Sequence, residues 1–340
     1  MDAQTLGFGI VGCGGISAVH IAAIDLLPGA HLAGVTDRDI ACARQTAQTH
    51  HTRVFASFAD MLASPDVDIV SLCTPCGLHA PMTLEARKAG KHVGVEKPLS
   101  LTLPDADAVI AQADASDRKV CVISQLRFSP AVQAVSQALA GGQLGRVVSA
   151  RLTMHYWRSP QYYASSPWRG TRAMDGGGAL MNQGIHGVDL MLYLLGPVRR
   201  LSALTKTQTH AIETEDTAAA LLEFASGAVG TLQASTTCHP GYPRTLEICG
   251  DGGSVVLRED SILSWDLPGE APETLHAQGN PAQDHKAIHP EGHRIQLENM
   301  INAVQGKEPL LVDAREGRKP LALILAVYES ARQGTFISPA

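Results

Sequence analysis

One stretch near the N-terminus, residues 7–27, limits what this chain can fold into. It reads GFGIVGCGGISAVHIAAIDLL: a short apolar run, three closely spaced glycines, and then apolar residues at a helical period. Gly12 permits a tight turn, and Gly14 lets backbone approach a pyrophosphate without a Cβ in the way. The N–H groups and dipole of the helix start attract phosphate. The stretch predicts a dinucleotide-binding strand–turn–helix unit, with Ser17 where the pattern usually has Gly or Ala.

A second apolar run, residues 32–36, ends at an acidic residue. This residue, Asp37, follows Gly12 by 25 positions. Its carboxylate suits the ribose hydroxyls of the adenosine half of a dinucleotide and repels a 2′-phosphate, which favours NAD. NADP stays open, because Arg38 is a possible partner for that phosphate. The alternative interpretation is an ordinary α/β turn followed by an exposed aspartate.

Composition excludes several classes of protein. The 340 residues carry a formal net charge of −6, which gives no reason to expect nucleic acid or an anionic membrane as a partner. No apolar run approaches the ~20 residues of a membrane helix. The N-terminus enters the first strand without a basic region or a cleavage site, so we expect a cytoplasmic protein.

The spacing of apolar runs predicts an α/β fold with two domains. Up to residue 124 strands and helices alternate, which predicts a Rossmann domain with a parallel, doubly wound sheet. Strands are expected at 7–11, 31–36, 53–55, 67–73, 91–95 and 119–124, with helices at 16–27, 39–50, 57–63, 78–89 and 105–116.

From residue 125 to 340 the pattern predicts an α+β domain with a largely antiparallel, open sheet. Short β runs with hairpin-type turns follow one another between residues 200 and 265. Helices are expected at 131–140, from the triple glycine at 176–178 to Leu195, and at 293–305 and 315–333. The two predicted domains are therefore residues 1–124 and 125–340.

A lysine stands at the end of one expected parallel strand, in the run Gly94-Val95-Glu96-Lys97-Pro98. The carboxyl ends of parallel strands face the ligand crevice, so Lys97 is expected to point at whatever binds beside the cofactor. The alternative is a surface lysine in a turn.

The helix after the triple glycine carries three polar residues on one stripe. At about 100° per residue, Asn182, His186 and Asp189 lie together, opposite an apolar face. Small, hydrogen-bonding residues suit a helix that faces a ligand cleft. The alternative is a partly buried helix in which His186 bonds Asp189.

Aromatic and arginine residues gather in the loop before that helix: Trp157, Arg158, Tyr162, Tyr163, Trp168, Arg169 and Arg172. Such a loop suits a polyhydroxylated or anionic ligand, because aromatic faces stack on sugars and arginine pairs with carboxylates. The alternative is a packed loop with solvated arginines.

No metal site is expected. The histidines at 276, 285, 289 and 293 lie in a segment broken by Pro290 and Gly292. The Cys73–Cys76 pair follows a strand and has no second pair, so free thiols are expected.

Five blocks together resemble the Gfo/Idh/MocA family of NAD(P)-dependent sugar oxidoreductases. They are the VGCGGIS turn, the Thr74-Pro75…His79 segment, Glu96-Lys97-Pro98, the GGGALMNQGIHGVDLMLYLLG helix and the closing AVYESARQG helix. The resemblance runs nearly end to end. It implies hydride transfer between a sugar or cyclitol CH–OH and NAD(P), with Lys97 beside the nicotinamide and His186 in proton transfer. We therefore expect the two side chains to meet in one crevice.

The resemblance also implies the rest of the site. Cofactor contacts are expected from Gly12, Gly14, Gly15, Ile16, Asp37, Arg38, Thr74, Pro75, His79, Glu96 and Lys97. Substrate contacts are expected from Lys97, Arg158, Trp168, Arg169, Asn182 and His186. Many members carry Asp where this chain has Asn182, and an amide cannot take part in proton transfer. We therefore expect His186 and Lys97 to carry out the acid–base chemistry.

Substrate and assembly are less closely defined. The run from Arg158 to His186 is similar to the subgroup that oxidises the 3-hydroxyl of UDP-N-acetylglucosaminuronic acid. A homo-oligomer, dimer or tetramer, is expected from the family's open sheet. Two alternatives stay open: an NAD-dependent glycosidase of the same family that acts by transient oxidation, and a non-catalytic NAD-dependent sensor or binding protein.

Overall fold

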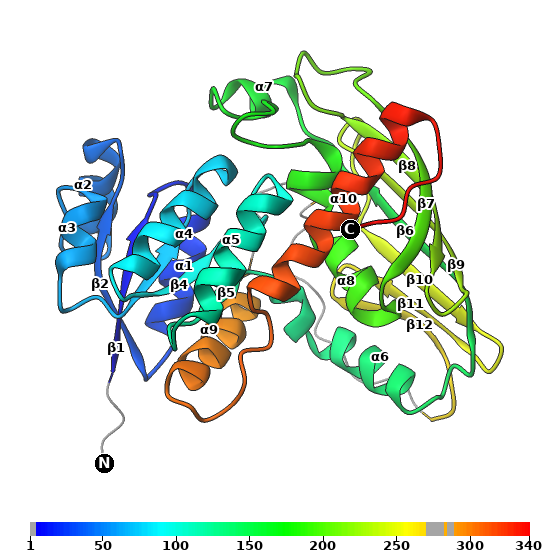
Figure 1. The fold of residues 1–340 in the computed structure, drawn as a ribbon, viewed down its shortest axis with the longest axis horizontal. Coiled ribbons are helices and arrows are strands. Elements are labelled where there is room, and N and C mark those ends of the chain that lie inside the picture. The colour runs from blue at the N-terminus through cyan, green and yellow to red at the C-terminus, as the bar shows by residue number, and fades with distance from the viewer. Residues whose placement is uncertain (1–4, 270–281, 284–288) are drawn as a thin grey trace. The chain divides into compact units, whose positions relative to one another are not determined.

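The computed structural model describes residues 5–269, 282–283 and 289–340, which fall into two compact units (Figure 1). The first comprises the chain up to Gln125 together with His289–Arg318, and the second comprises Leu126–Ile288 and Lys319–Ala340. The division into domains 1–124 and 125–340 stays a prediction. The coordinates group the segment 289–318 with the first unit.

The first unit alternates strands with helices. Its elements are β1 (Leu6–Val11), α1 (Gly15–Asp25), β2 (Ala30–Thr36), α2 (Ile40–Thr49), α3 (Phe58–Ala63), β3 (Ile69–Leu72), η1 (Cys76–Leu78), α4 (His79–Lys88), β4 (His92–Val95), α5 (Leu103–Asp114), β5 (Val120–Val122) and α9 (Glu291–Val304). Several helix starts have a side-chain cap: the Ser57 side chain accepts a hydrogen bond from the N–H of Asp60.

The strands of this unit form one parallel sheet in the order β2-β1-β3-β4-β5. Every residue of β1, β3, β4 and β5 is buried, as a sheet covered on both faces requires. The strand expected at 53–55 is wrong, because this segment makes only an isolated bridge between Val54 and Val35. The strand order reverses between β1 and β3, and ligands bind open α/β sheets at that point.

Helix α9 completes the core of the first unit. Its Leu297, Met300 and Ile301 are buried in the cluster that also contains Phe8 of β1 and Ile21 of α1. A segment nearly 300 residues from the N-terminus therefore supplies apolar area that the alternating βα pattern does not reveal.

The second unit contains a larger sheet and its helices. Its elements are η2 (Gln125–Phe128, which starts at the unit boundary), α6 (Pro130–Ala140), β6 (Val147–His155), α7 (Pro160–Ala164), η3 (Ala179–Gly184), α8 (Ile185–Leu195), β7 (Val198–Lys206), β8 (Thr217–Phe224), β9 (Val229–Ser235), β10 (Thr245–Gly250), β11 (Ser254–Arg258) and β12 (Ser261–Asp266). Helix α10 (Ala314–Gln333) begins in the first unit and ends in the second.

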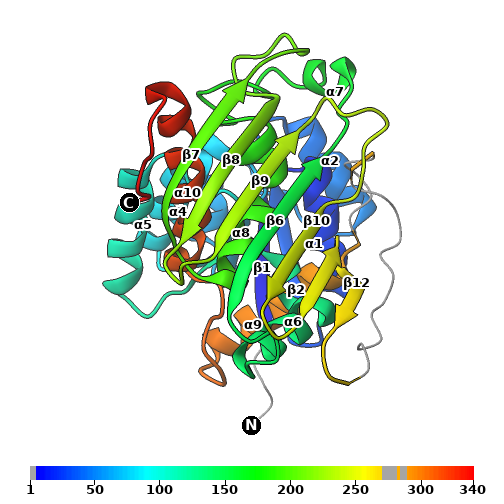
Figure 2. The ribbon, with the colours of Figure 1, turned by 90° about the vertical axis from the view of Figure 1, so that its right-hand side faces the viewer.

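The seven strands lie in the order β12-β11-β10-β6-β9-β8-β7. All neighbours are antiparallel except β6 and β9, so the largely antiparallel sheet is confirmed. Figure 2 shows the sheet face-on, with α8 behind it. Buried and exposed residues alternate along β8, and Leu204, Leu221, Val229 and Leu263 are all more than half exposed.

Within the part of the chain that the structure describes, no helix is both long enough and apolar enough to cross a membrane. All seven cysteines lie in that part, and each is a free thiol.

Candidate active site

The glycine turn has the geometry that its sequence predicts. Gly12 has φ +91°, and a Cβ there would stand 2.6 Å from the carbonyl oxygen of Cys73, so no larger residue fits. A Cβ at Gly14 or Gly15 would meet nothing within 4 Å. The Ser17 hydroxyl donates to the carbonyl oxygen of Gly14 at 2.6 Å and is buried. The open space at the start of α1, beside half-buried Ile16, is where a pyrophosphate fits.

The carboxylate of Asp37 follows β2 and is fixed by backbone. Its Oδ2 accepts from the N–H of Cys13 at 2.7 Å, and its Oδ1 accepts from the N–H of Asp39 at 2.7 Å. Each oxygen keeps a lone pair for a ribose hydroxyl. Arg38 is exposed beside it, so this end of the site contains both charges that the sequence predicts.

The segment after β3 contains a buried hydroxyl with no partner. The Oγ1 of Thr74 is buried and has no hydrogen-bond partner among the described residues. Half-buried Pro75 follows and precedes η1. A polar atom of this kind at the switch point of the sheet is expected to bond a ligand.

The ring of His79 lies between two loops. Its Nδ1 is 2.6 Å from the carbonyl oxygen of Pro98, and its Nε2 is 2.9 Å from that of Thr74. Burial lowers the pKa of His79, while the two carbonyls act in the opposite direction. The ring therefore ties the end of β3 to the turn after β4, and its predicted cofactor contact stays a prediction.

Glu96 and Lys97 follow β4 directly. Lys97 is half-buried and Glu96 is buried, with its Oε1 at 2.9 Å from His20 Nε2. The glycine turn follows β1, Asp37 follows β2 and Thr74 follows β3. Because these strands are parallel neighbours, the four groups share one edge of the sheet. This is the edge at which a dinucleotide fits.

In the second unit, the helix after the triple glycine departs from the expected geometry. Residues Ala179–Gly184 form a π-helical turn, and the α-helix starts only at Ile185. The rotation of 100° per residue used to place Asn182 on a stripe with His186 does not apply across this turn. Turns of this type are frequent at functional sites.

A buried carboxylate, Glu215, holds the start of the π turn. It accepts hydrogen bonds from the N–H groups of Gly178 at 3.0 Å and Leu180 at 2.8 Å, and from the Tyr328 hydroxyl at 2.9 Å. Only glycine fits at 178, because a Cβ there would stand 1.9 Å from the carbonyl oxygen of Glu215. The triple glycine thus allows a close approach that the sequence did not reveal.

Asn182 is fixed by its neighbours. Its amide nitrogen donates to Oδ1 of buried Asp175, and its amide oxygen accepts from Gln183 Nε2 at 3.0 Å. His186 is half-buried on the first turn of α8. Asp189 makes a bidentate ion pair with Arg127, at 2.8 Å from Nε and 2.6 Å from Nη2.

The aromatic loop packs around its arginines. Arg158 is buried and donates to Gln183 Oε1 at 2.9 Å and to the carbonyl oxygen of Ala282 at 3.0 Å. The guanidinium of Arg169 lies over Tyr162 at 4.1 Å and over Trp168 at 4.8 Å. Its Nε is buried and has no hydrogen-bond partner among the described residues.

A cavity of about 540 Å³ adjoins this loop within the second unit. Its lining includes Tyr163, Pro167, Arg169, Gly170, Ile212 and Glu213. Of the substrate residues predicted from sequence, Arg169 therefore lies at a cavity, whereas Arg158 is mainly engaged by protein groups.

Sequence reasoning assigned no role to the buried groups His20, Asp175, Glu215 and Arg127, and it did not reveal the buried partners of Asp189 and His293. Most of these partners lie far away in the chain, such as Arg127, which is 62 residues from Asp189. His293 lies in α9 and approaches Glu96, while His289 is exposed. His276 and His285 lie outside the described residues.

The open glycine turn, the fixed carboxylate of Asp37 and the Thr74 hydroxyl, which has no partner among the described residues, fit NAD and are typical of a dinucleotide-binding protein. The family model "Oxidoreductase family, NAD-binding Rossmann fold" matches residues 6–124, and "GFO/IDH/MocA C-terminal domain" matches residues 132–256. The chain belongs to the GFO/IDH/MocA family and is an NAD-dependent dehydrogenase.

Individual relatives agree with this assignment. D-apiose dehydrogenase of Paraburkholderia graminis is 30% identical over 96% of this chain and 87% of its own. Myo-inositol 2-dehydrogenase of Thermotoga maritima is 25% identical over 96% of both. The crystal structure of the WlbA dehydrogenase of Bordetella pertussis, in complex with NADH and UDP-GlcNAcA, has a TM-score of 0.89 at 32% identity over 99% of both chains.

Proposed function

We propose that this protein oxidises a secondary hydroxyl group of a sugar or cyclitol, with NAD as the hydride acceptor. Within that class the 3-hydroxyl of a sugar, sugar acid or nucleotide sugar is the preferred candidate. The observation that carries the proposal is the position of Lys97, at the same edge of the parallel sheet as the open glycine turn, Asp37 and Thr74.

Lys97 and His186 are the residues proposed for proton transfer. Oxidation of a CH–OH group releases a hydride from carbon and a proton from oxygen. When bound, the nicotinamide accepts the hydride. One of these two side chains takes the proton as the hydride leaves, so that no free alkoxide forms. Asn182, whose amide is fixed by Asp175 and Gln183, is proposed to orient the hydroxyl group.

Arg169 is proposed to recognise an anionic part of the substrate. Its planar guanidinium is held over two aromatic rings beside a cavity, and its buried Nε has no partner among the described residues. A carboxylate or phosphate would supply that partner. The relative crystallised with UDP-GlcNAcA supports a sugar acid as a candidate.

Steady-state kinetics of four proteins tests the proposed roles: wild type, Lys97→Ala, His186→Ala and the double variant. Each single variant is expected to lower kcat by about 10²–10⁴-fold, with the dissociation constant of NADH nearly unchanged. If the two residues act on one proton, the double variant loses little more than either single variant. Wild-type turnover in both single variants would end the assignment.

The substrate is identified by a panel of neutral sugars, cyclitols, sugar acids and nucleotide sugars, followed by NADH absorbance. Arg169→Met is expected to raise KM for sugar acids and nucleotide sugars by about 10-fold or more, and to leave KM for neutral sugars unchanged. An equal change for both groups would contradict the recognition of an anion.

The same panel separates the two alternatives. A glycosidase acting by transient oxidation would release free sugar with no net NADH. A non-catalytic sensor would bind NAD and leave every sugar unchanged.

Cofactor preference is tested with the variant Asp37→Ala. We expect it to bind NAD more weakly than wild type does and to bind NADP better relative to NAD, because the carboxylate no longer repels the 2′-phosphate.

We also propose a homo-oligomer. One face of the seven-stranded sheet is not covered by helices (Figure 2). Leu204 of β7, Leu221 of β8 and Val229 of β9 are exposed, and exposed apolar residues that lie together mark interaction surfaces. Light scattering on the purified protein is expected to give the mass of a dimer or a tetramer. Leu221→Lys is expected to lower that mass.

A further inference from the structure

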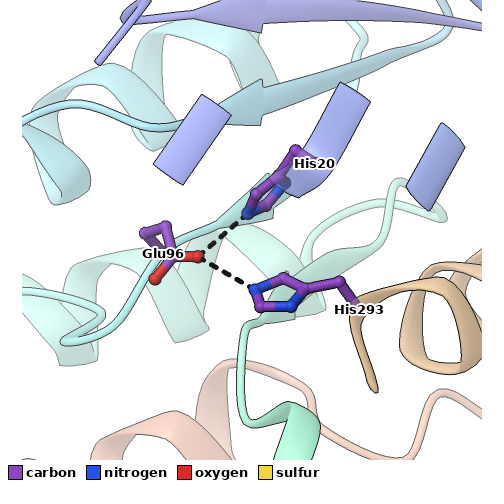
Figure 3. Close-up of side chains that lie close together, drawn as sticks. All are labelled: His20, Glu96 and His293. Atoms are coloured by element: carbon purple, nitrogen blue, oxygen red, sulfur yellow. Dashed lines mark hydrogen bonds and ion pairs between the residues drawn. The ribbon is translucent and has the colours of Figure 1, made fainter. Parts of the chain in front are cut away.

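Three buried side chains meet inside the first unit, beneath the sheet edge that carries Lys97 (Figure 3). His20 comes from α1, Glu96 follows β4 and His293 comes from α9. Their exposed fractions are 0%, 6% and 1%. Oε1 of Glu96 lies 2.9 Å from His20 Nε2 and 3.6 Å from His293 Nε2. We call these residues the His–Glu–His cluster.

The hydrogen-bond partners of His20 indicate which of its ring nitrogens carries a proton. An ionised carboxylate can only accept, so His20 Nε2 carries a proton and donates to Glu96. The other ring nitrogen, His20 Nδ1, lies 2.7 Å from the Ser71 hydroxyl, so both nitrogens of this ring have a hydrogen-bond partner. His293 faces the same carboxylate oxygen, and neither of its ring nitrogens has a hydrogen-bond partner within 3.5 Å among the described residues.

Electrostatic interactions within the cluster keep Glu96 ionised. Burial alone would raise the pKa of Glu96, but the two imidazoles outweigh it and hold that pKa well below its usual range. Burial lowers the pKa of His293, Glu96 acts in the opposite direction, and the charges of His20 and Lys97 lower it further. Among the described residues, Cys73 after β3 and His79 on α4 also interact electrostatically with Glu96. Glu96 is therefore an ionised carboxylate, and it directly precedes Lys97 in the chain.

The backbone of Lys97 is held on both sides. Before it, Glu96 Oε2 accepts from the N–H of Lys97 at 3.3 Å. After it, the carbonyl oxygen of Pro98 lies 2.6 Å from His79 Nδ1. The cluster thus connects α1, whose first turn carries the open glycines, to the residue proposed to act on the substrate.

Two histidines and a glutamate are also a set of metal ligands, and their ligand atoms all lie within 4.8 Å of one another. The distance between His20 Nε2 and Glu96 Oε1 is 2.9 Å. Two ligands of a tetrahedral zinc, each about 2.0–2.1 Å from the ion, stand roughly 3.3 Å apart. The shorter distance is that of a hydrogen bond.

We propose that the His–Glu–His cluster is a positioning network for Lys97, which it fixes relative to the dinucleotide-binding turn. The inference rests on the proposed function, in which Lys97 acts in proton transfer. Glu96, His20 and His293 are positioning residues in this scheme. Displacement of a reacting group by about 1 Å costs up to about 100-fold in rate, so a buried network that prevents it has a measurable effect.

The first test compares His293→Leu with His293→Gln, alongside Glu96→Gln. His293→Leu and Glu96→Gln are expected to lower kcat by about 10- to 100-fold. In His293→Leu, which changes no expected cofactor contact, KM and the NADH dissociation constant are expected to stay within about two-fold of wild type. His293→Gln keeps a polar N–H group facing the Glu96 carboxylate, as His293 Nε2 does at 3.6 Å, and is expected to have a kcat close to that of wild type. His31→Leu, which changes an exposed histidine of β2, is the matched control and is expected to have wild-type kcat.

Rates are expressed per NADH-binding site, so that partial unfolding does not imitate the effect. If the cluster serves only stability, the variants melt at lower temperature but keep their kcat per site. That outcome, or equal kcat in His293→Leu and His293→Gln, overturns the inference.

A second test does not depend on activity. Competitive acetylation with trace acetic anhydride, read by mass spectrometry, compares the reactivity of Lys97 with that of exposed Lys307. The ratio is expected to change several-fold in Glu96→Gln and in His293→Leu, and an unchanged ratio contradicts the inference. If wild type oxidises no substrate, the proposed function fails and this ratio alone decides. Stoichiometric zinc in the purified protein, lost in His293→Leu, would also overturn the network in favour of a metal site.

Discussion

Arg127 and Asp189 form a buried, bidentate ion pair inside the second unit. The guanidinium donates from Nε at 2.8 Å and from Nη2 at 2.6 Å to the two carboxylate oxygens, and both residues are at most 5% exposed. The pair fixes α8, the helix that carries His186, to the segment that precedes α6. The predicted polar stripe therefore contains one residue, Asp189, that serves the fold.

Asp189→Asn is expected to destabilise the second unit by about 3–5 kcal/mol, because it leaves the Arg127 cation buried without its counter-charge. The matched control is Glu247→Gln, which breaks the ion pair between Glu247 and Arg151. In that pair the Glu247 side chain is 29% exposed and the Arg151 side chain is 58% exposed. We expect less than about 1 kcal/mol there. Urea unfolding of both variants measures the difference, and similar losses would contradict the distinction.

Two substitutions in the glycine turn are expected to have different effects, one on stability and the other on cofactor binding. Gly12→Ala is expected to lower stability, because φ is +91° and the new Cβ meets the Cys73 carbonyl oxygen at 2.6 Å. Gly14→Ala meets nothing within 4 Å and has an ordinary φ of −81°. It should melt like wild type but bind NADH at least about 10-fold more weakly, a factor that corresponds to about 1.4 kcal/mol. Thermal melting and NADH fluorescence titration distinguish the two.

A substitution at Asn182 tests how a second carboxyl group beside Asp175 affects stability. Asn182→Asp sets a second carboxyl group against Asp175, so that one of the pair keeps a proton and its pKa is raised. Stability is then present at low pH and is lost as pH rises through that raised pKa. We expect the melting temperature of the variant to fall between pH 5 and pH 8 relative to wild type. Adding Asp175→Asn restores one amide and one carboxylate, and should remove most of the loss.

His92 gives the protein a defined acid sensitivity. Burial, followed by the charges of Arg118 and Arg87, lowers its pKa to about 4. Its Nδ1 accepts from the N–H of Lys119 at 3.0 Å, which a protonated ring cannot do. In the unfolded chain the ring takes up a proton below about pH 6.5. Stability should therefore fall as pH drops from about 6.5 to 4, by roughly 3 kcal/mol from this residue.

The measurement is the unfolding free energy as a function of pH. In His92→Gln the slope between pH 4 and 6.5 should decrease by about one proton, while the buried rings of His79 and His293 keep part of it. Exposed His31→Gln should leave the slope unchanged. A wild-type slope in His92→Gln would show that this ring is already protonated in the folded protein.

Much of the fold could be predicted because its signals are local. The periods of the apolar runs place the strands β1 to β5 of the first sheet to within a few residues, and the cap at Ser57 and the turn at Gly12 depend on residues only a few positions away. The strand expected at 53–55 fails because an apolar run there, Val54 to Phe55, makes a single bridge to β2 rather than a ladder.

In the helix after the triple glycine, the period of the sequence did not predict the local structure. An assumed α-helix placed Asn182 and His186 on one stripe, but the chain adopts a π turn over Ala179–Gly184. That choice depends on Glu215, which is 35 residues from Leu180 and binds its N–H. No pattern within the helix itself carries this information.

What the sequence determined by itself is the dinucleotide-binding turn, the order of strands and helices, and the residues Asp37, Lys97 and His186 as candidates for chemistry. Each depends on residue type and short spacing, which steric and hydrogen-bonding rules convert directly into local structure. Only the tertiary structure decided how buried charges are paired: His20 and His293 with Glu96, Arg127 with Asp189, and Asp175 with Asn182. The physical reason is that the low dielectric of the interior requires a partner for each buried polar group, and the folded chain supplies it from any distance along the sequence.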